Sequence, residues 1–484
     1  MMQQRADDIQ NTRRGKRPSA LGAVFSRRFR QGLCAALALA LAGCAALPSG
    51  MGAQASSAAP SAGAAPPATA ESAAPQTLAV WYQQENAAAA RALSLYAAAN
   101  NVTVTTAEDA ASAGLGVLTG EPADTAAWRD LSAAGDPLLA AAARRAGLDP
   151  SGALYTLPLG KTLYAYWADG SLLTALLGQD FAVSDLQNAT WDEWEAFVAA
   201  LSGWIAAPAA KTVTLNGNRY TLPAEKPDAA ARLNGVFALA TGADAFTGAA
   251  YSAALVAADA TMTDEALSGP LYGLLNAFSL ETAALSGPDG ALARGGALPA
   301  LSAADAAALL GDGKAVFYRG RLTDATLHLS PDFCQKLVPV PQKTKLAEED
   351  LTTAEYNVTG LLNYPVLVTA GRLAIPAAAD DAAAGAGASF ILWLYGSGGG
   401  SAALTDAVGL ITPWNTASDQ TALGAMQVAQ VSAGVIPGAE LSDAALQGTA
   451  DAAQTLLGLA DWKTADRAAF VAAAEQALGV PAGG

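Results

Sequence analysis

The chain has 484 residues, with 27 lysines and arginines, 43 aspartates and glutamates, one histidine and three cysteines. Its formal net charge of −16 repels phosphate backbones and anionic headgroups, which argues against nucleic-acid binding and electrostatic docking on a membrane. A single histidine excludes a two-histidine metal motif, and a Ser–His–Asp triad would depend on His328 alone. We interpret His328, in the segment ATLHLSPDF, as a hydrogen-bonded structural residue in a strand that ends in a turn.

The N-terminal region has the pattern of an export signal. Residues 1–31 are basic, and the apolar run GLCAALALALAG at 32–43 is too short to span a bilayer as a mature helix. Small residues then precede Cys44, an order that resembles the lipobox of bacterial lipoproteins. We therefore expect residues 1–43 to be a lipoprotein signal peptide and Cys44 to carry the lipid. The alternative is an ordinary signal peptide that happens to contain this cysteine.

The next segment predicts a tether. Residues 44–76 consist almost entirely of alanine, serine, proline and glycine after the cysteine, so they cannot form a core and should be disordered. Removal of residues 1–43 leaves 19 basic and 41 acidic residues, a net charge of −22, which we attribute to solubility. Beyond Cys44 only Cys334 remains, so the folded part cannot contain an internal disulfide.

Residues 77–484 should form the folded domain, and their number exceeds a comfortable single core, which favours two lobes. Short apolar runs alternate with alanine-rich helical stretches, as in α/β proteins with a parallel sheet. The expected elements are a strand at 77–82, a helix at 83–101, strands at 101–109 and 113–124, and a helix at 124–135.

Two further segments are more specific. LYTLPLGKTLYAYW at 154–167 predicts a turn at Pro158-Leu159-Gly160 and then an aromatic strand, and Thr190 to Glu193 has the form of a helix capping box. Together they resemble the bacterial extracellular solute-binding proteins of ABC importers, especially the carbohydrate-binding group. Segments similar to later motifs of that family follow in the same order, at 311–317, 338–343, 373–396 and 406–415. The chain departs from the family at Ala168-Asp169, where an asparagine is usual.

The resemblance implies a periplasmic-binding-protein-like fold, with two α/β lobes, hinge strands and a ligand cleft between the lobes. Open α/β sheets bind ligands beyond the carboxyl ends of their strands, so residues after the first and third strands are candidates. Sugar sites combine aromatic rings with polar side chains, which adds candidates from later segments. The candidate ligand-binding residues are Trp81, Tyr82, Gln83, Glu85, Thr119, Gly120, Glu121, Tyr164, Trp167, Tyr318, Arg319, Arg321, Trp414 and Asn415.

Each candidate also has a purely structural interpretation. Trp81 and Trp167 are equally suited to anchor a core, and Arg319 and Arg321 to pair with surface carboxylates. Trp414, beside a proline in an expected turn, has better prospects of exposure.

The expected function is that of a monomeric, lipid-anchored solute-binding component of an ABC importer on the extracytoplasmic face of the cell membrane. It would bind a sugar or oligosaccharide by lobe closure and deliver it to permease subunits, without catalysis, cofactor or metal. The alternatives are a cell-surface glycoside hydrolase with two carboxylates, and a sensor or adhesion receptor with the same fold but no transport role.

Overall fold

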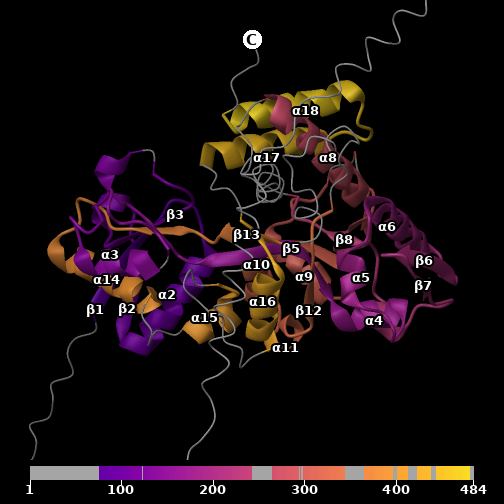
Figure 1. Cartoon of the computed structure of the whole chain (residues 1–484), viewed down its shortest axis with the longest axis horizontal. Helices are drawn as coiled ribbons and strands as arrows, with labels where there is room; N and C mark the ends of the chain where they lie inside the picture. The colour runs from indigo at the N-terminus through magenta and orange to yellow at the C-terminus, as the bar shows by residue number, and fades with distance from the viewer. Residues whose placement is uncertain are drawn as a thin grey trace, which may run out of the picture. The chain divides into compact units, whose positions relative to one another are not determined.

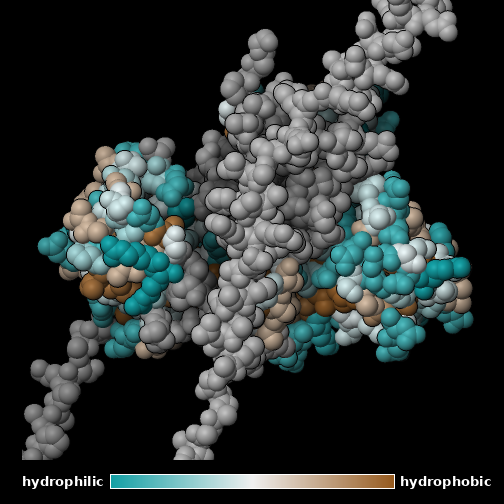
Figure 2. Space-filling view, viewed as in Figure 1, coloured by the Kyte–Doolittle hydropathy of each residue, from teal (hydrophilic) through white to brown (hydrophobic). Residues whose placement is uncertain are grey.

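The computed structural model describes residues 76–122, 124–145, 147–241, 264–293, 295, 298–343, 365–395, 401–411, 422–437 and 443–479 (Figure 1). Three predicted site residues, Cys44, Trp414 and Asn415, lie outside these ranges, as do the signal peptide and nearly all of the tether. Within them, no helix is long and apolar enough to cross a membrane. Hydrophilic residues cover most of the described surface in Figure 2, and hydrophobic ones form small patches in that view.

The first sheet begins with the three strands that the sequence predicts. They are parallel, and a later strand, antiparallel to the third, joins them to a short fifth strand, in the order β2-β1-β3-β14-β4. Their bounds are β1 Gln76–Tyr82, β2 Val102–Thr106, β3 Leu115–Leu118, β4 Leu157–Pro158 and β14 Arg372–Ala374.

Three helices pack with this sheet. They are α2 Ala87–Asn100, α3 Pro137–Arg145 and α14 Asp381–Tyr395. The Asn86 side chain caps α2 by accepting a hydrogen bond from the Ala89 amide at 2.9 Å. Alternation along β1 directs Leu78 and Val80 into a shared core with these helices, while Trp81 packs in a separate cluster.

The helix expected at 124–135 is wrong. Asp124 caps only one 3₁₀ turn, Thr125–Ala127, and Trp128 is then extended and bridges to Pro376. Asp130 follows, and its carboxylate accepts hydrogen bonds from the amides of Ser132 and Leu154. Short polar side chains of this kind compete with helical hydrogen bonds, which explains why the helix begins only at α3.

The second sheet is built around β5, the aromatic strand that the sequence predicts at 161–169. Its neighbour on one edge is β11, and β13 and β12 share the other edge end to end. Both faces of β5 are buried, as its nearly continuous apolar sequence requires. The strands are β5 Lys161–Asp169, β8 Phe237–Ala238, β9 Leu285–Ser286, β10 Ala291–Leu292, β11 Phe317–Arg321, β12 Leu337–Val340, β13 Val366–Thr369 and β15 Ile436–Pro437.

The predicted capping box is confirmed at the start of α6 Trp191–Ala206. The Thr190 hydroxyl accepts from the Glu193 amide at 3.3 Å, and the Glu193 carboxylate accepts from the Thr190 amide at 3.0 Å. Trp194, on the buried face of α6, stacks on Tyr166 of β5 with ring centroids 5.4 Å apart. Nearby elements are α4 Gly170–Leu177, α5 Val183–Gln187 and the hairpin β6 Lys211–Leu215 and β7 Asn218–Leu222.

The prediction of a strand around His328 is also wrong. His328 is the exposed last residue of α10 Leu322–His328, and Ser330 caps the short helix α11 Pro331–Cys334. Because its imidazole is exposed at the end of a helix, His328 is not part of a buried strand. The remaining helix beside the second sheet is α9 Ala303–Gly311.

The remaining described helices are α8 Asp264–Thr282, α15 Ser401–Val408, α16 Ala422–Ala433, α17 Asp443–Leu457 and α18 Thr464–Ala477. Helices α8, α17 and α18 share an apolar cluster of their own, in which Phe278 stacks on Trp462 at 5.4 Å (Figure 1). Helix α8 therefore belongs to this cluster as well as to the second sheet, which its C-terminal turn contacts through Glu281.

The chain passes between the two sheets at neighbouring extended segments. The Leu159 amide donates to the Gly371 carbonyl at 2.8 Å, and the Ala370 amide to the Gly160 carbonyl at 2.9 Å. Lys161 and Ile411 exchange two backbone hydrogen bonds of 2.7 and 2.6 Å. The turn predicted at 158–160 is thus an extended link. Gly371 has a φ of 144°, which only glycine adopts readily.

Lys343 has a fully buried amino group beside the second sheet. Its ammonium donates to the carbonyls of Gln187 and Ala189, and burial lowers its pKa to about 7, against the opposing effect of the Glu193 carboxylate. The unfolded chain keeps the ordinary pKa near 10.5, so between these values it binds more protons than the folded protein. This contribution to the free energy of unfolding therefore rises with pH.

We expect Lys343→Met to remove this pH dependence. The difference in free energy of unfolding between wild type and variant should change by about 1.4 kcal/mol per pH unit from pH 7.5 to 9.5. Urea unfolding at several pH values measures it, and parallel profiles for the two proteins would contradict the assignment.

Candidate functional site

An aromatic group lies at the carboxyl end of β1. Trp81 is partly exposed, and its ring lies 6.2 Å from that of Trp128 between centroids, at an interplanar angle of 34°. Tyr155, also partly exposed, packs on the same cluster, whose buried members include Leu118. Gly116 makes room for it, because a Cβ there would lie 2.6 Å from the Trp128 ring. The partly exposed rings of Trp81 and Tyr155 therefore pack on the buried side chains of Trp128 and Leu118.

A polar group lies beyond the end of the neighbouring strand β3. Arg372 Nη1 is 2.6 Å from Glu121 Oε1, and it also donates to the Thr156 hydroxyl at 2.8 Å. That hydroxyl in turn donates to Glu121 Oε2 at 2.8 Å. The Arg372 side chain is 8% exposed and that of Glu121 is 57% exposed. A buried guanidinium and a hydroxyl therefore orient a carboxylate that solvent, or a ligand, can reach.

A hydrogen bond between Thr119 and Gln83 lies near these two groups. The Thr119 amide donates to Gln83 Oε1 at 3.3 Å, which joins the chain after β3 to the chain after β1. The Thr119 hydroxyl oxygen is buried and has no hydrogen-bond partner among the described residues. A buried hydroxyl without a partner is costly, so this atom is suited to meet a polar group of a ligand.

Two other candidates from the first strand differ in placement. Tyr82 packs against the opposite core, which it shares with α2 and α14, and burial raises the pKa of its hydroxyl. Glu85 is exposed in the loop before the cap of α2. The structure therefore brings Trp81 and Glu121 to one edge of the first sheet, and it directs Tyr82 away from that edge.

The candidates on β5 and β11 lie in the interior of the second sheet. Trp167 is fully buried and its indole N–H donates to the Gly320 carbonyl at 2.9 Å, so its prediction as a ligand platform is corrected to a core anchor. Tyr318 is buried likewise, and burial raises its pKa. Tyr164 is 4% exposed, and burial raises its pKa to about 12.

The two arginines of β11 have carboxylate partners. Arg319 Nη1 lies 2.8 Å from Glu281 Oε2, with side chains only 2% and 1% exposed, so Arg319 is corrected from a ligand contact to half of a buried ion pair. This contact does not have hydrogen-bond geometry, although its charges attract at that distance. Arg321 is partly exposed and makes two 3.1 Å hydrogen bonds to Asp324.

The buried pair is coupled to an aromatic strand residue. The Tyr166 hydroxyl donates to Glu281 Oε1, and the Arg319 guanidinium lies 5.7 Å from the Phe278 ring centroid. Desolvation raises the pKa of Glu281, and Arg319 and Tyr166 lower it in part. Burial and the Glu281 charge both raise the pKa of Tyr166. This group fixes the last turn of α8 to the second sheet.

Solved structures of bacterial solute receptors resemble the chain. The receptor AcbH, described with an exclusive preference for β-D-galactopyranose, is 12% identical, with a TM-score of 0.53, over 83% of this chain and 98% of that chain. A Streptococcus pneumoniae solute-binding protein in complex with the blood group A-trisaccharide is 12% identical over 83% and 99%, with a TM-score of 0.52. Maltose-bound T. maritima MalE3 is 12% identical over 83% and 98%, also with a TM-score of 0.52.

The chain has the solute-receptor fold. No protein-family model matches the sequence, and no curated protein matches it. The prediction of a two-lobed α/β fold is confirmed: the first and second sheets are the cores of the two lobes.

Within this solute-receptor fold, the sequence missed four residues of the candidate site. Tyr155 and Thr156 directly precede the strand β4, and Trp128 lies in the segment that the sequence assigned to a helix. Arg372 pairs with Thr156 across a separation of 216 residues. Arg372 reaches the site only because β14 pairs between β3 and β4. No local sequence pattern predicts that pairing.

Acidic residues are dispersed in the described part of the receptor fold. There, no group of three or more histidine, cysteine, aspartate or glutamate side chains is arranged to hold a metal ion. Cys334 is buried with a free thiol, and burial raises its pKa to about 11.

Proposed function

We propose that this protein is an extracytoplasmic solute-binding receptor that binds a sugar or oligosaccharide for an ABC importer. The observation that carries the proposal is the site at the carboxyl edge of the first sheet, which holds both the partly exposed ring of Trp81 and the oriented carboxylate of Glu121. A sugar presents a face of C–H groups and a rim of hydroxyls. An aromatic ring and an oriented carboxylate at the same edge of a sheet are suited to these two features.

The fold supports this placement. Ligands of open α/β sheets bind beyond the carboxyl ends of the strands, where Trp81 and Glu121 lie. The solved receptors with the same fold include ones whose descriptions name galactopyranose, a trisaccharide and maltose. Glu85, Arg321, Trp414 and Asn415 remain proposed contributors to ligand binding, whereas the burial of Tyr164 within β5 favours a structural role for that residue.

The proposed mechanism is closure of the two lobes around the ligand. The links at 158–161 and 369–372, together with Ile411, would act as the hinge, because few residues there connect the sheets. The closed form would then deliver the ligand to permease subunits. We further propose that Cys44 carries a lipid that retains this monomeric receptor at the membrane, with residues 44–76 as its tether.

A panel of neutral mono- and oligosaccharides, screened by thermal shift and then by calorimetry, tests the function. We expect saturable binding with no product released on long incubation. Release of a cleaved sugar would contradict the receptor proposal in favour of a glycoside hydrolase, and the absence of any sugar binding would contradict the ligand class.

Trp81→Ala should weaken binding of the best sugar about tenfold, because the variant loses an aromatic contact of roughly 1.4 kcal/mol. Trp191→Ala is the matched control, since Trp191 is also partly exposed but lies at the start of α6. Equal affinities for the two variants, measured by calorimetry, would place the ligand elsewhere.

A further inference from the structure

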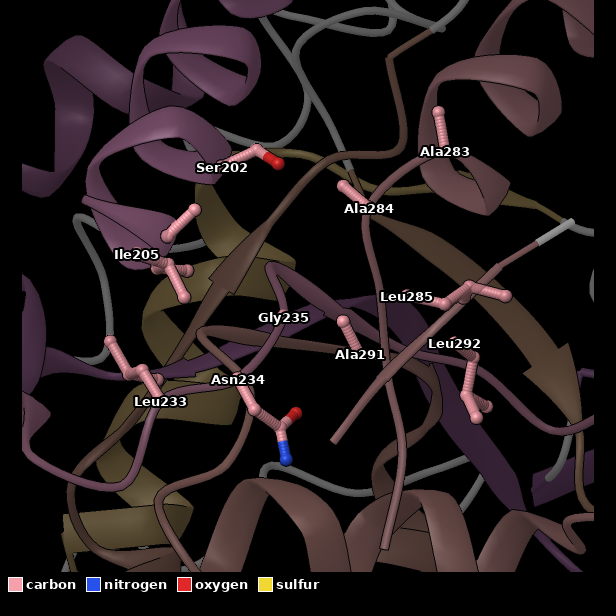
Figure 3. A pocket seen from close by; sticks show the side chains of 11 residues that line it. Ser202, Ile205, Leu233, Asn234, Gly235, Ala283, Ala284, Leu285, Ala291 and Leu292 are labelled. Atoms are coloured by element: carbon pink, nitrogen blue, oxygen red, sulfur yellow. The ribbon is translucent and has the colours of Figure 1, made fainter. Parts of the chain in front are cut away.

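A pocket of about 340 Å³ lies in the second lobe, away from the proposed sugar site. It opens to the surface and is lined by the last turns of α6, the segment before β8 and the hairpin β9–β10 (Figure 3). Ile205 and Leu233 line one side in this view, and Leu285 and Leu292 line the other. Alanines cover much of the remaining wall, and no charged or aromatic side chain is among the described residues that line the pocket.

Hydrogen bonds hold the floor of the pocket in place. The amides of Asn234 and Gly235 both donate to the Lys314 carbonyl, at 3.0 and 3.3 Å. The Asn234 side chain donates to the Gly287 carbonyl at 3.0 Å and accepts from the Ser286 hydroxyl at 2.5 Å. A Cβ at Gly235 would lie 2.4 Å from the Ser286 amide nitrogen, so the two backbone segments leave no room for a side chain at this position.

These hydrogen bonds hold the segment before β8 and the β9–β10 hairpin in a fixed relation to each other. Protein interiors are otherwise close-packed, and well-formed pockets of roughly 300 Å³ and above are typical of sites for small molecules. The volume is therefore a preformed feature of the second lobe.

The lining selects the class of ligand. The described residues that line the pocket include no charged side chain that could compensate a carboxylate, phosphate or ammonium group for lost hydration. They also include no aromatic ring of the kind that sugar sites use as a platform. The Ser202 hydroxyl, which points toward Ala284 in Figure 3, offers one hydrogen bond.

We infer that this pocket is a second binding site, for a small neutral molecule with an aromatic or aliphatic body and at most one polar group. Apolar cavities of about 150 Å³ admit benzene, so a pocket of about 340 Å³ admits a two-ring molecule the size of indole. Such a ligand would bridge α6 and the β9–β10 hairpin, independently of the site at Trp81.

Indole is the probe for this inference, titrated by calorimetry into the full chain. Two substitutions fill the pocket from opposite walls, Ser202→Phe from α6 and Ala284→Phe from the segment before β9. Ala210→Phe, at an exposed position after α6, is the matched control. We expect wild type and Ala210→Phe to bind indole equally, and each filled variant that keeps its thermal transition to bind at least tenfold more weakly.

Trp81→Ala should leave indole binding unchanged. The inference is overturned if wild type shows no saturable binding, if a folded filled variant binds with unchanged affinity, or if Trp81→Ala abolishes binding. The two filled variants alter different elements of the fold. If one of them misfolds, indole binding by the other still tests the inference.

Discussion

Glu281→Ala should lower the free energy of unfolding by about 3–5 kcal/mol, the largest loss we expect from a single polar substitution. The substitution leaves the Arg319 guanidinium, 2% exposed, without its counter-charge, and it removes the acceptor of the Tyr166 hydroxyl. Neither group can reach water where it lies. Denaturant unfolding followed by circular dichroism measures the loss.

Asp324→Ala is the comparison, because Asp324 of α10 pairs with Arg321 at the end of β11, whose side chain is 32% exposed, and accepts only a long 3.4 Å hydrogen bond from the Tyr318 hydroxyl. Exposed pairs contribute about 1 kcal/mol or less. The double variant Glu281→Leu with Arg319→Met should recover most of the loss, since desolvation already raises the pKa of Glu281 and marks the charged pair as costly. Losses of equal size for Glu281→Ala and Asp324→Ala would contradict this account.

Arg372→Met should weaken sugar binding about 10- to 100-fold, the largest effect that we expect at the proposed site. Arg372 contacts both Glu121 and Thr156, so its loss frees the carboxylate to move and leaves the Thr156 hydroxyl with one partner fewer. A charge-assisted hydrogen bond of this kind contributes about 1.5–3 kcal/mol, which corresponds to that range of affinity. Calorimetry with the best sugar of the panel measures it.

Arg145→Met controls for the loss of an arginine in the same lobe. Arg145 ends α3 and donates to the Tyr395 carbonyl at 3.3 Å, within the helical layer of the first lobe. Glu121→Gln should lower affinity in the same direction as Arg372→Met, because both disturb the same carboxylate. If Arg145→Met and Arg372→Met bind the sugar equally well, the Glu121 group is not part of the binding site.

The sequence predicted correctly the strands and helix starts that depend on short segments of the chain. The strands at Thr77–Tyr82 and in the LYAYW segment follow from short apolar runs, and the start of α6 follows from the Thr190–Glu193 capping box. Prediction failed where polar side chains redirect the backbone, as at Asp124 and Asp130, and around His328, where a short helix replaced the expected strand.

The candidate site likewise contains residues that the sequence predicts and residues that it does not. Trp81 and Glu121 follow from the rule that ligands bind at the carboxyl ends of strands, because the sequence predicts both β1 and β3 and these two strands are neighbours in the sheet. Arg372 depends on a pairing between distant strands, and the burial of Trp167 and Arg319 depends on which elements cover the second sheet. The residue type alone does not distinguish an aromatic side chain in a core from one at a ligand site.

The position of β14 between β3 and β4 has a consequence for the order of synthesis. The first sheet has its earliest strands near the start of the chain, but the strand that joins them to β4 ends at Ala374. A nascent chain that has reached Pro158 therefore carries two unpaired strand edges until the whole second sheet up to β13 has been made. The first sheet is therefore completed only after most of the second sheet has been synthesised, so the folding of the first lobe ends late and overlaps with that of the second.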